Sequence, residues 1–257
     1  MNAIEQNIRT KLAEVESKTG VRVLHAVESG SRAWGFESPD SDYDVRFIYA
    51  GSAESYLRLE RTRDVIEWQL DEVFDINGWD LAKALRLLHD SNPTLFEWRN
   101  SPIVYATRPE WETVSSLFDA YFRPKKSVYH YLSMARSKVQ GYLGGDEVNL
   151  KKYFYIVRPL LACRWIIANR TAVPMLFSDL VDAVLPDSMK PVVGELLAAK
   201  AETSELGTGP HIAELDSYIY GEVEDLSTAV DFMEPDRVPE WGPLDEAFRT
   251  IVLPSSS

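Results

Sequence analysis

The hydrophobic pattern of this chain changes character near residue 120, and that change limits the folds it can adopt. Before residue 120, short β-branched runs alternate with short helical runs, as in a small sheet with helices beside it. After residues 123–126, long apolar runs keep the 3.6-residue spacing of helices. We therefore predict an α+β protein with a small mixed β-sheet domain and flanking helices over residues 1–120. A C-terminal helical bundle domain should follow over residues 121–257.

Local periodicity also predicts the elements of the two domains. Residues 80–88 form the strongest helical pattern, because leucine and alanine recur on one face, and Asp80 is placed to cap this helix. Strand-like runs occupy residues 21–27, 42–49, 63–70 and 72–76. The second domain should contain helices over residues 127–143, 149–169, 177–185, 191–205 and 210–233.

Composition excludes several classes of protein. The chain has 257 residues, of which 45% are hydrophobic and 26% charged, which is ordinary for a soluble globular protein. No run approaches the roughly 18 apolar residues of a membrane span, and residues 1–20 read as an amphipathic helix rather than a signal peptide. Cys163 is the only cysteine, so no intrachain disulfide can form. We expect a cytoplasmic protein with no membrane partner.

The charge of the chain is unevenly distributed. The net charge of −13 argues at first against an anionic partner. Residues 121–170, however, carry ten basic and two acidic side chains, whereas residues 171–257 carry four basic and seventeen acidic ones. A basic segment between acidic flanks can attract an anionic ligand locally. The alternative is a solvated helix face rich in lysine and arginine.

The stretch from Gly30 to Arg46 combines a phosphate-binding pattern with a metal-binding pattern. Gly30-Ser31 follows a strand and begins a short helix, where glycine lets the backbone approach a ligand and N–H groups attract phosphate. Asp42 and Asp44 are two apart in a strand, so their carboxylates project from one face with Cα atoms roughly 7 Å apart. Such carboxylates can hold Mg²⁺, with Mn²⁺ as an alternative. A third carboxylate from a neighbouring strand would complete a site for two ions.

Asp-x-Asp alone is a weak signal, but its position after a strand and Gly-Ser is more specific. In this order the chain resembles the DNA polymerase β superfamily of nucleotidyltransferases, whose mark is Gly-Ser followed by Asp-x-Asp or Asp-x-Glu. The fuller string Gly-Ser-Arg-Ala-Trp-Gly, then Ser-Asp-Tyr-Asp-Val-Arg, is similar to its YcgL-like, RNA repair-associated branch. Similar segments begin at Asp75, Ser91, Ser101 and Lys152, so the resemblance covers roughly residues 20–230.

The third carboxylate has three candidates. Asp75 is our choice, as a metal ligand and catalytic residue, because it lies in an apolar strand-like run where a charge needs a reason. Glu67, in the preceding strand-like run, is the competitor. Asp80 is better explained by its capping position.

Two arginines flank the motif and are candidates for nucleotide binding. Arg32 follows Gly-Ser directly, and Arg46 lies two residues after Asp-x-Asp. Either could contact phosphate, and either could equally be a surface arginine.

The basic segment contains a second candidate for nucleotide binding. Lys151, Tyr155 and Arg158 share one face of an expected helix, with Lys152 beside them. A tyrosine for base stacking among cations for phosphate favours nucleotide binding by the helical domain. The alternative is an interdomain contact.

The resemblance implies a function as well as a fold. It places Gly30 and Ser31 at the triphosphate, and Asp42 and Asp44 on metal as catalytic residues. The implied enzyme is a template-independent nucleotidyltransferase that moves a nucleoside monophosphate from ATP or CTP to an acceptor, with pyrophosphate released. An RNA end is the preferred acceptor. The alternatives are nucleotidylation of a protein or small molecule, and an inactive nucleotide- or RNA-binding protein.

Overall fold

The computed structural model describes residues 3–39, 41–60, 62–202 and 207–253. The chain forms two compact units, and neither is continuous in sequence. The first unit comprises Met1–Ala33, Asp42–Phe122 and Pro239–Ser257, and the second comprises Trp34–Ser41 and Arg123–Val238. Within the described ranges, no helix is long and apolar enough to cross a membrane.

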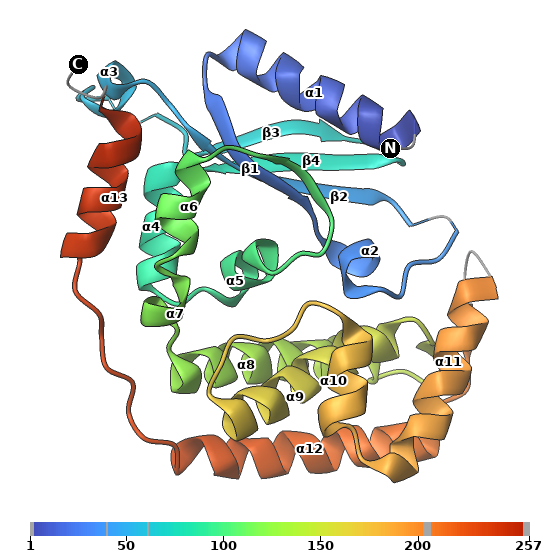
Figure 1. Cartoon of the computed structure of the whole chain (residues 1–257). Helices are drawn as coiled ribbons and strands as arrows, with labels where there is room; N and C mark the ends of the chain where they lie inside the picture. Colours follow the sequence, from blue (N-terminus) through green and yellow to red (C-terminus); the bar gives the residue numbers. More distant parts are fainter. Residues whose placement is uncertain (1–2, 40, 61, 203–206, 254–257) are drawn as a thin grey trace. The chain divides into compact units, whose positions relative to one another are not determined.

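The first unit is built on a five-stranded mixed sheet with the order β3-β4-β2-β1-β5 (Figure 1). The neighbours β2 and β4 are parallel, and the other pairs are antiparallel. The parallel register places Asp44 opposite Asp75 and Tyr49 opposite Asp80, so this strand pair carries polar residues toward both ends. The strands are β1 Arg22–Glu28, β2 Tyr43–Ala50, β3 Val65–Leu70, β4 Phe74–Asp80 and β5 Val104–Thr107.

One face of this sheet is covered by α1 (Ala3–Thr19), which Figure 1 shows lying across the strands. The buried apolar side chains of α1 form one cluster with Phe47 and Tyr49 of β2. Gly78 of β4 lies opposite Phe47, and a Cβ on Gly78 would come within 2.2 Å of the Phe47 ring. Glycine at this position therefore leaves the room that the aromatic core side chain needs.

Helix α4 (Leu81–His89) follows β4 directly and contacts both β2 and β4. The predicted cap is confirmed, because Asp80 Oδ1 accepts a hydrogen bond from Ala82 N at 2.8 Å. The C-terminal helix α13 packs on α4 and α6, so the end of the chain completes the first unit. The other helices with residues in this unit are α2 Gly30–Trp34, α3 Ala53–Tyr56, α5 Pro93–Arg99, α6 Glu110–Ser115, α7 Phe118–Tyr121 and α13 Gly242–Val252.

The second unit is mainly a helical bundle in which α9 contacts α8, α10 and α12. The early segment Trp34–Ser41 belongs to it, and Phe36 of this segment stacks on Phe154 of α9 with ring centroids 5.3 Å apart. The elements are α8 Pro124–Tyr142, β6 Val148–Asn149, α9 Lys152–Asn169, α10 Phe177–Val184, the 3₁₀ turn Asp187–Met189, α11 Lys190–Glu202, β7 Thr208–Gly209 and α12 Ala213–Asp231.

The predicted fold class is confirmed, since a mixed sheet with helices precedes a set of C-terminal helices. The linear division into residues 1–120 and 121–257 stays a prediction about domains. The contacts place residues 34–41 with the second unit and residues 239–257 with the first. Strand β5 was not predicted, and the last residues of the expected helix 191–205 lie outside the described residues.

Candidate active site

The backbone at Gly30 lies directly against Asp44. Gly30 has a φ of +62°, and a Cβ there would lie only 1.9 Å from Asp44 Oδ2. Ser29 N also donates to the backbone oxygen of Asp44 at 2.8 Å. The left-handed conformation and the close approach both require glycine. The Gly-Ser and Asp-x-Asp motifs are separated in the sequence, and the fold brings them into contact.

Asp44, Arg46 and Asp75 form a compact charged group. Side chains alternate along a strand, so the first two lie on the face of β2 opposite to Phe47 and α1. Arg46 Nη2 donates to Asp44 Oδ1 at 2.8 Å and to Asp75 Oδ2 at 2.6 Å. Its Nη1 donates to the Asp75 backbone oxygen at 2.7 Å. One guanidinium therefore bridges two carboxylates on neighbouring strands.

The exposed Asp42 lies directly before β2, and its charge repels that of Asp44. Burial raises the pKa of the Asp44 carboxyl, and the Arg46 guanidinium lowers it in opposition. The charges of Asp42 and Asp75 raise the pKa of Asp44 further. Carboxylates that disfavour one another's ionised form favour a cation between them.

The chemistry of this group fits a divalent cation. Asp42, Asp44 and Asp75 offer the hard oxygen donors that Mg²⁺ prefers. The Arg46 guanidinium stands in for such a cation between two of them. In the part of the chain that the structure describes, no three His, Cys, Asp or Glu side chains are gathered as a metal-binding group. A bound metal would therefore have to replace Arg46 in its contacts.

Glu28, which sequence reasoning missed, supports the start of β2. It is fully buried, and its Oε1 accepts from Asp44 N at 2.8 Å while Tyr105 Oη donates to its other carboxylate oxygen. Burial raises the pKa of Glu28 to about 7, against the effect of both hydrogen bonds. An acidic residue ending an apolar strand, just before Ser29-Gly30, is the signal that could have revealed it.

Ser31 and Arg32 follow Gly30 in α2. Ser31 is largely buried. Arg32 Nε donates to the backbone oxygen of Asp42 at 3.0 Å, and the guanidinium lies 3.9 Å from the centre of the Tyr43 ring. Arg32 therefore holds the segment that carries Asp42, and its contact with phosphate stays a prediction.

The competitors of Asp75 have other partners. Glu67 lies on the edge strand β3 with 65% of its side chain exposed, and it pairs with Arg63 at 2.7 Å. Asp80 caps α4 and accepts from Tyr56 Oη at 2.8 Å. The geometry favours Asp75, which lies directly opposite Asp44.

The basic, aromatic face predicted in the second unit is centred on Tyr155. Lys152 Nζ lies 5.6 Å from the Tyr155 ring centre and 4.7 Å from that of Tyr142. Lys138 Nζ, from α8, lies 5.3 Å from the Tyr155 ring centre. Lys151 lies half-buried directly before α9. Lys138 and Tyr142 were missed because they come from a different helix.

Arg158, in contrast, is an interior residue. Its side chain is buried, its guanidinium lies 4.4 Å from the Trp34 ring centre, and its Nη2 donates to Met175 O at 3.4 Å. Tyr155 meets the same Trp34 ring edge-on, with centroids 6.0 Å apart. Helical spacing placed Arg158 on the Tyr155 face, but it could not reveal that Trp34 packs there. This placement supports a packing role and gives no support to a direct phosphate contact.

Comparisons with known proteins extend the similarity beyond these motifs. Residues 4–250 match the RNA repair pathway DNA polymerase beta family, RlaP. The uncharacterized protein YcgL of Bacillus subtilis (strain 168) is 44% identical over 228 residues, which is 88% of each chain. A nucleotidyltransferase-like protein from Exiguobacterium sibiricum 255-15, a solved structure, is 14% identical with a TM-score of 0.31, covering 89% of this chain and 75% of that one.

Proposed function

Because this chain belongs to the RNA repair pathway DNA polymerase beta family, we propose that it is a template-independent, metal-dependent nucleotidyltransferase. The resemblance seen in the sequence is thereby confirmed at the level of the family. The observation that carries the proposal is the placement of Asp44 opposite Asp75 on parallel strands, with Gly30 against Asp44. Two carboxylates held together need a positive partner, which is Arg46 in this structure and would be metal in the proposed enzyme.

In the proposed reaction, the acceptor oxygen attacks the α-phosphorus of an NTP, and the bond to the bridging oxygen of the β-phosphate breaks, so pyrophosphate leaves. Two Mg²⁺ ions held by Asp42, Asp44 and Asp75 would neutralise phosphate charge and lower the pKa of the acceptor hydroxyl. Asp75 accepts the proton of that hydroxyl at a carboxylate oxygen. Gly30 and Ser31 bind the triphosphate through backbone N–H groups and the serine hydroxyl.

We propose an RNA end as the acceptor and ATP or CTP as the donor. The half-buried Tyr155 ring and the lysines Lys138 and Lys152 on it combine a stacking surface with positive charge. Surfaces of this composition bind single-stranded nucleic acid with little base preference. The cluster lies in the one segment of this acidic chain with a clear basic surplus, and Lys151 extends it.

Transfer of label tests the reaction and its acceptor together. The protein would be incubated with each NTP radiolabelled at the α-phosphate, Mg²⁺, RNA oligonucleotides and extract proteins. We expect label on RNA. Label on protein or on a small molecule would replace the RNA acceptor with the alternative class of nucleotidylation. If no NTP gave label on any acceptor, the chain would be a binding protein rather than a transferase.

Matched variants test the third carboxylate. Asp75→Asn should lower the rate of transfer on the order of 10³-fold, because it removes a charge at the reacting phosphate. Glu67→Gln, at an exposed surface ion pair, should leave the rate within about twofold. The reverse result would assign the role to Glu67.

A further inference from the structure

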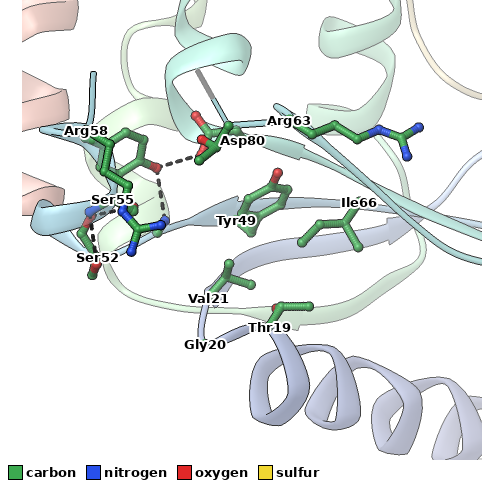
Figure 2. A pocket seen from close by; sticks show the side chains of 13 residues that line it. Thr19, Gly20, Val21, Tyr49, Ser52, Ser55, Arg58, Arg63, Ile66 and Asp80 are labelled. Atoms are coloured by element: carbon green, nitrogen blue, oxygen red, sulfur yellow. Dashed lines mark hydrogen bonds between the residues drawn. The ribbon is translucent and has the colours of Figure 1, made fainter. Parts of the chain in front are cut away.

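A second site lies at the other end of β2. A cavity of about 470 Å³ is lined there by the turn after α1, the end of β2, the region of α3, and β3 (Figure 2). Tyr49 lines this cavity, and it lies five residues after Asp44 on the same strand, or about 17 Å along it. The two side chains also point to opposite faces of the sheet. The cavity is therefore separate from the carboxylate group.

Tyr49 provides a buried polar group in the wall of this cavity. Its side chain is only 4% exposed, and its hydroxyl makes no hydrogen bond to the residues that the structure describes. Its oxygen is not one of the buried polar atoms that lack a partner, so it is accessible to a ligand in the cavity. Burial and the nearby Asp80 raise the pKa of Tyr49, which keeps the phenol protonated as a donor.

The two arginines of the cavity differ in what they contact. Arg63 is paired with Glu67 at 2.7 Å, and Figure 2 shows its side chain reaching away from the other labelled residues. Arg58 lies near Ser52 and Ser55 (Figure 2) and makes no ion pair with any residue in the described ranges. The Ser55 hydroxyl donates to Ser52 O at 2.6 Å, whereas the Ser52 hydroxyl only accepts, from Ser55 N at 3.2 Å, and can still donate. An exposed guanidinium beside this hydroxyl suits the oxygens of a phosphate group.

The remaining walls limit what else could bind. Asp80 does not offer a free carboxylate, because its oxygens accept from Tyr56 Oη at 2.8 Å and from Ala82 N at 2.8 Å. Val21 and Ile66 give the cavity an apolar side. The cavity therefore combines a cation with a hydroxyl at one end, a buried phenol donor and an apolar wall against which a ring can pack.

We propose that this cavity binds a small phosphorylated molecule with a hydroxylated ring, that is, a sugar phosphate or a nucleoside monophosphate. The phosphate contacts Arg58 and the Ser52 hydroxyl, a ring hydroxyl or ring oxygen accepts from Tyr49 Oη, and the ring packs on Ile66. The volume of about 470 Å³ accommodates a ligand of this size. Binding here needs no metal, since every group named is a hydrogen-bond donor or an apolar surface.

Methyl NMR tests the site in the whole protein. Ribose 5-phosphate and AMP would be titrated separately in the presence of EDTA, which removes the metal that the proposed active site requires. We expect saturable shifts of the Val21 and Ile66 methyl groups, with the Val45 methyls near the carboxylate end unchanged. Tighter binding of AMP selects a nucleotide, and equal binding selects the sugar phosphate alone. Shifts with neither compound, or shifts only at Val45, would overturn the proposal without touching the transferase proposal.

Two variants separate binding from folding. Arg58→Gln should weaken binding about tenfold, whereas Arg9→Gln, an exposed arginine of α1, should leave the affinity unchanged. Tyr49→Phe should weaken binding about fivefold and leave the stability of the unliganded protein unchanged within about 0.5 kcal/mol, because its hydroxyl makes no hydrogen bond to the described residues. Unchanged affinity in Arg58→Gln, or a lower melting temperature in unliganded Tyr49→Phe, would show that these groups serve the fold and not a ligand.

Discussion

Aspartates at the two ends of the β2–β4 strand pair have different kinds of hydrogen-bond partner. At one end, Asp75 lies opposite Asp44, and the two carboxylates share the guanidinium of Arg46. At the other end, Asp80 lies opposite Tyr49. It accepts hydrogen bonds from the hydroxyl of Tyr56 and from the backbone N–H of Ala82 in the first turn of α4. Burial raises the pKa of both Asp44 and Asp80, so burial alone does not distinguish the two ends.

The donors are what differ. The backbone N–H of Ala82 is the start of α4, and the hydroxyl of Tyr56 is held at the end of α3, so the contacts of Asp80 last as long as these two helices keep their places. The guanidinium of Arg46 is carried on a flexible side chain, and another cation can take its place. An aspartate with fixed donors serves the structure, whereas an aspartate with an exchangeable cation is available for metal chemistry. The comparison therefore predicts opposite results for the same substitution at the two ends.

The largest expected effect is that of Asp44→Asn on catalysis. Loss of this charge should lower nucleotidyl transfer on the order of 10³-fold, since it removes metal affinity and charge stabilisation together. The free energy of unfolding should stay within about 1 kcal/mol of wild type, because relief of carboxylate repulsion offsets the lost contact with Arg46. Radiolabel transfer and urea unfolding measure the two quantities. A variant that unfolds easily and transfers normally would reduce Asp44 to a structural residue.

Gly30→Ala should be the most damaging to the carboxylate end of the fold. The new Cβ would lie 1.9 Å from Asp44 Oδ2, and alanine disfavours the positive φ of this residue. We expect a loss of about 2–3 kcal/mol in the free energy of unfolding, measured with urea, and reduced transfer. Gly141→Ala is the matched control, since nothing lies within 4 Å of a Cβ there and the residue sits within α8. Equal stability of the two variants would contradict the close contact of Gly30 with Asp44.

Local sequence patterns were sufficient to predict those parts of the carboxylate end of the β2–β4 pair that lie within one strand or turn. The spacing of Asp42 and Asp44, the glycine before the short helix, and a charge at Asp75 within an apolar run each carry their own signal. The cap at Asp80 was equally local, because it depends only on the start of the helix that follows.

Contacts between distant segments were out of reach of such patterns. Arg46 was open between a phosphate contact and a surface position, and its contact with Asp75, 29 residues away, depends on the register of two strands. The contact of Glu28 with Tyr105 joins residues 77 apart, through a strand that was not predicted. Helical periodicity could place Arg158 on a face, but not show that the segment at Trp34 packs on it. Pairings of this kind are set by tertiary structure, which leaves no periodic trace in one segment.

Arg46→Gln should have an intermediate effect that depends on metal. Without the guanidinium, Asp44 and Asp75 lose their shared cation, and the metal-free protein should lose about 2 kcal/mol of stability. Added Mg²⁺ or Mn²⁺ should then raise the melting temperature more than in wild type, because the ion no longer displaces Arg46. Arg63→Gln, at an exposed ion pair, is the control and should show neither change. Equal stabilisation of both variants by metal would mean that Arg46 and the metal do not compete.

The smallest expected effect is that of Asp80→Asn. The same change from aspartate to asparagine at Asp44, at the other end of the strand pair, is the one expected to damage activity most. Asparagine also caps helices, so the free energy of unfolding should change by less than about 1 kcal/mol, and transfer should be unchanged.

The residual difference in stability between Asp80→Asn and wild type should depend on pH with a defined sign. Because the folded pKa of Asp80 is raised above 3.8, its contribution is fully present below that pH and is lost as pH rises through the folded pKa. Urea unfolding across this pH range should therefore show that the free energy of unfolding of the variant rises relative to that of wild type as pH increases. Loss of transfer in Asp80→Asn would contradict the comparison, since both ends of the strand pair would then serve the chemistry.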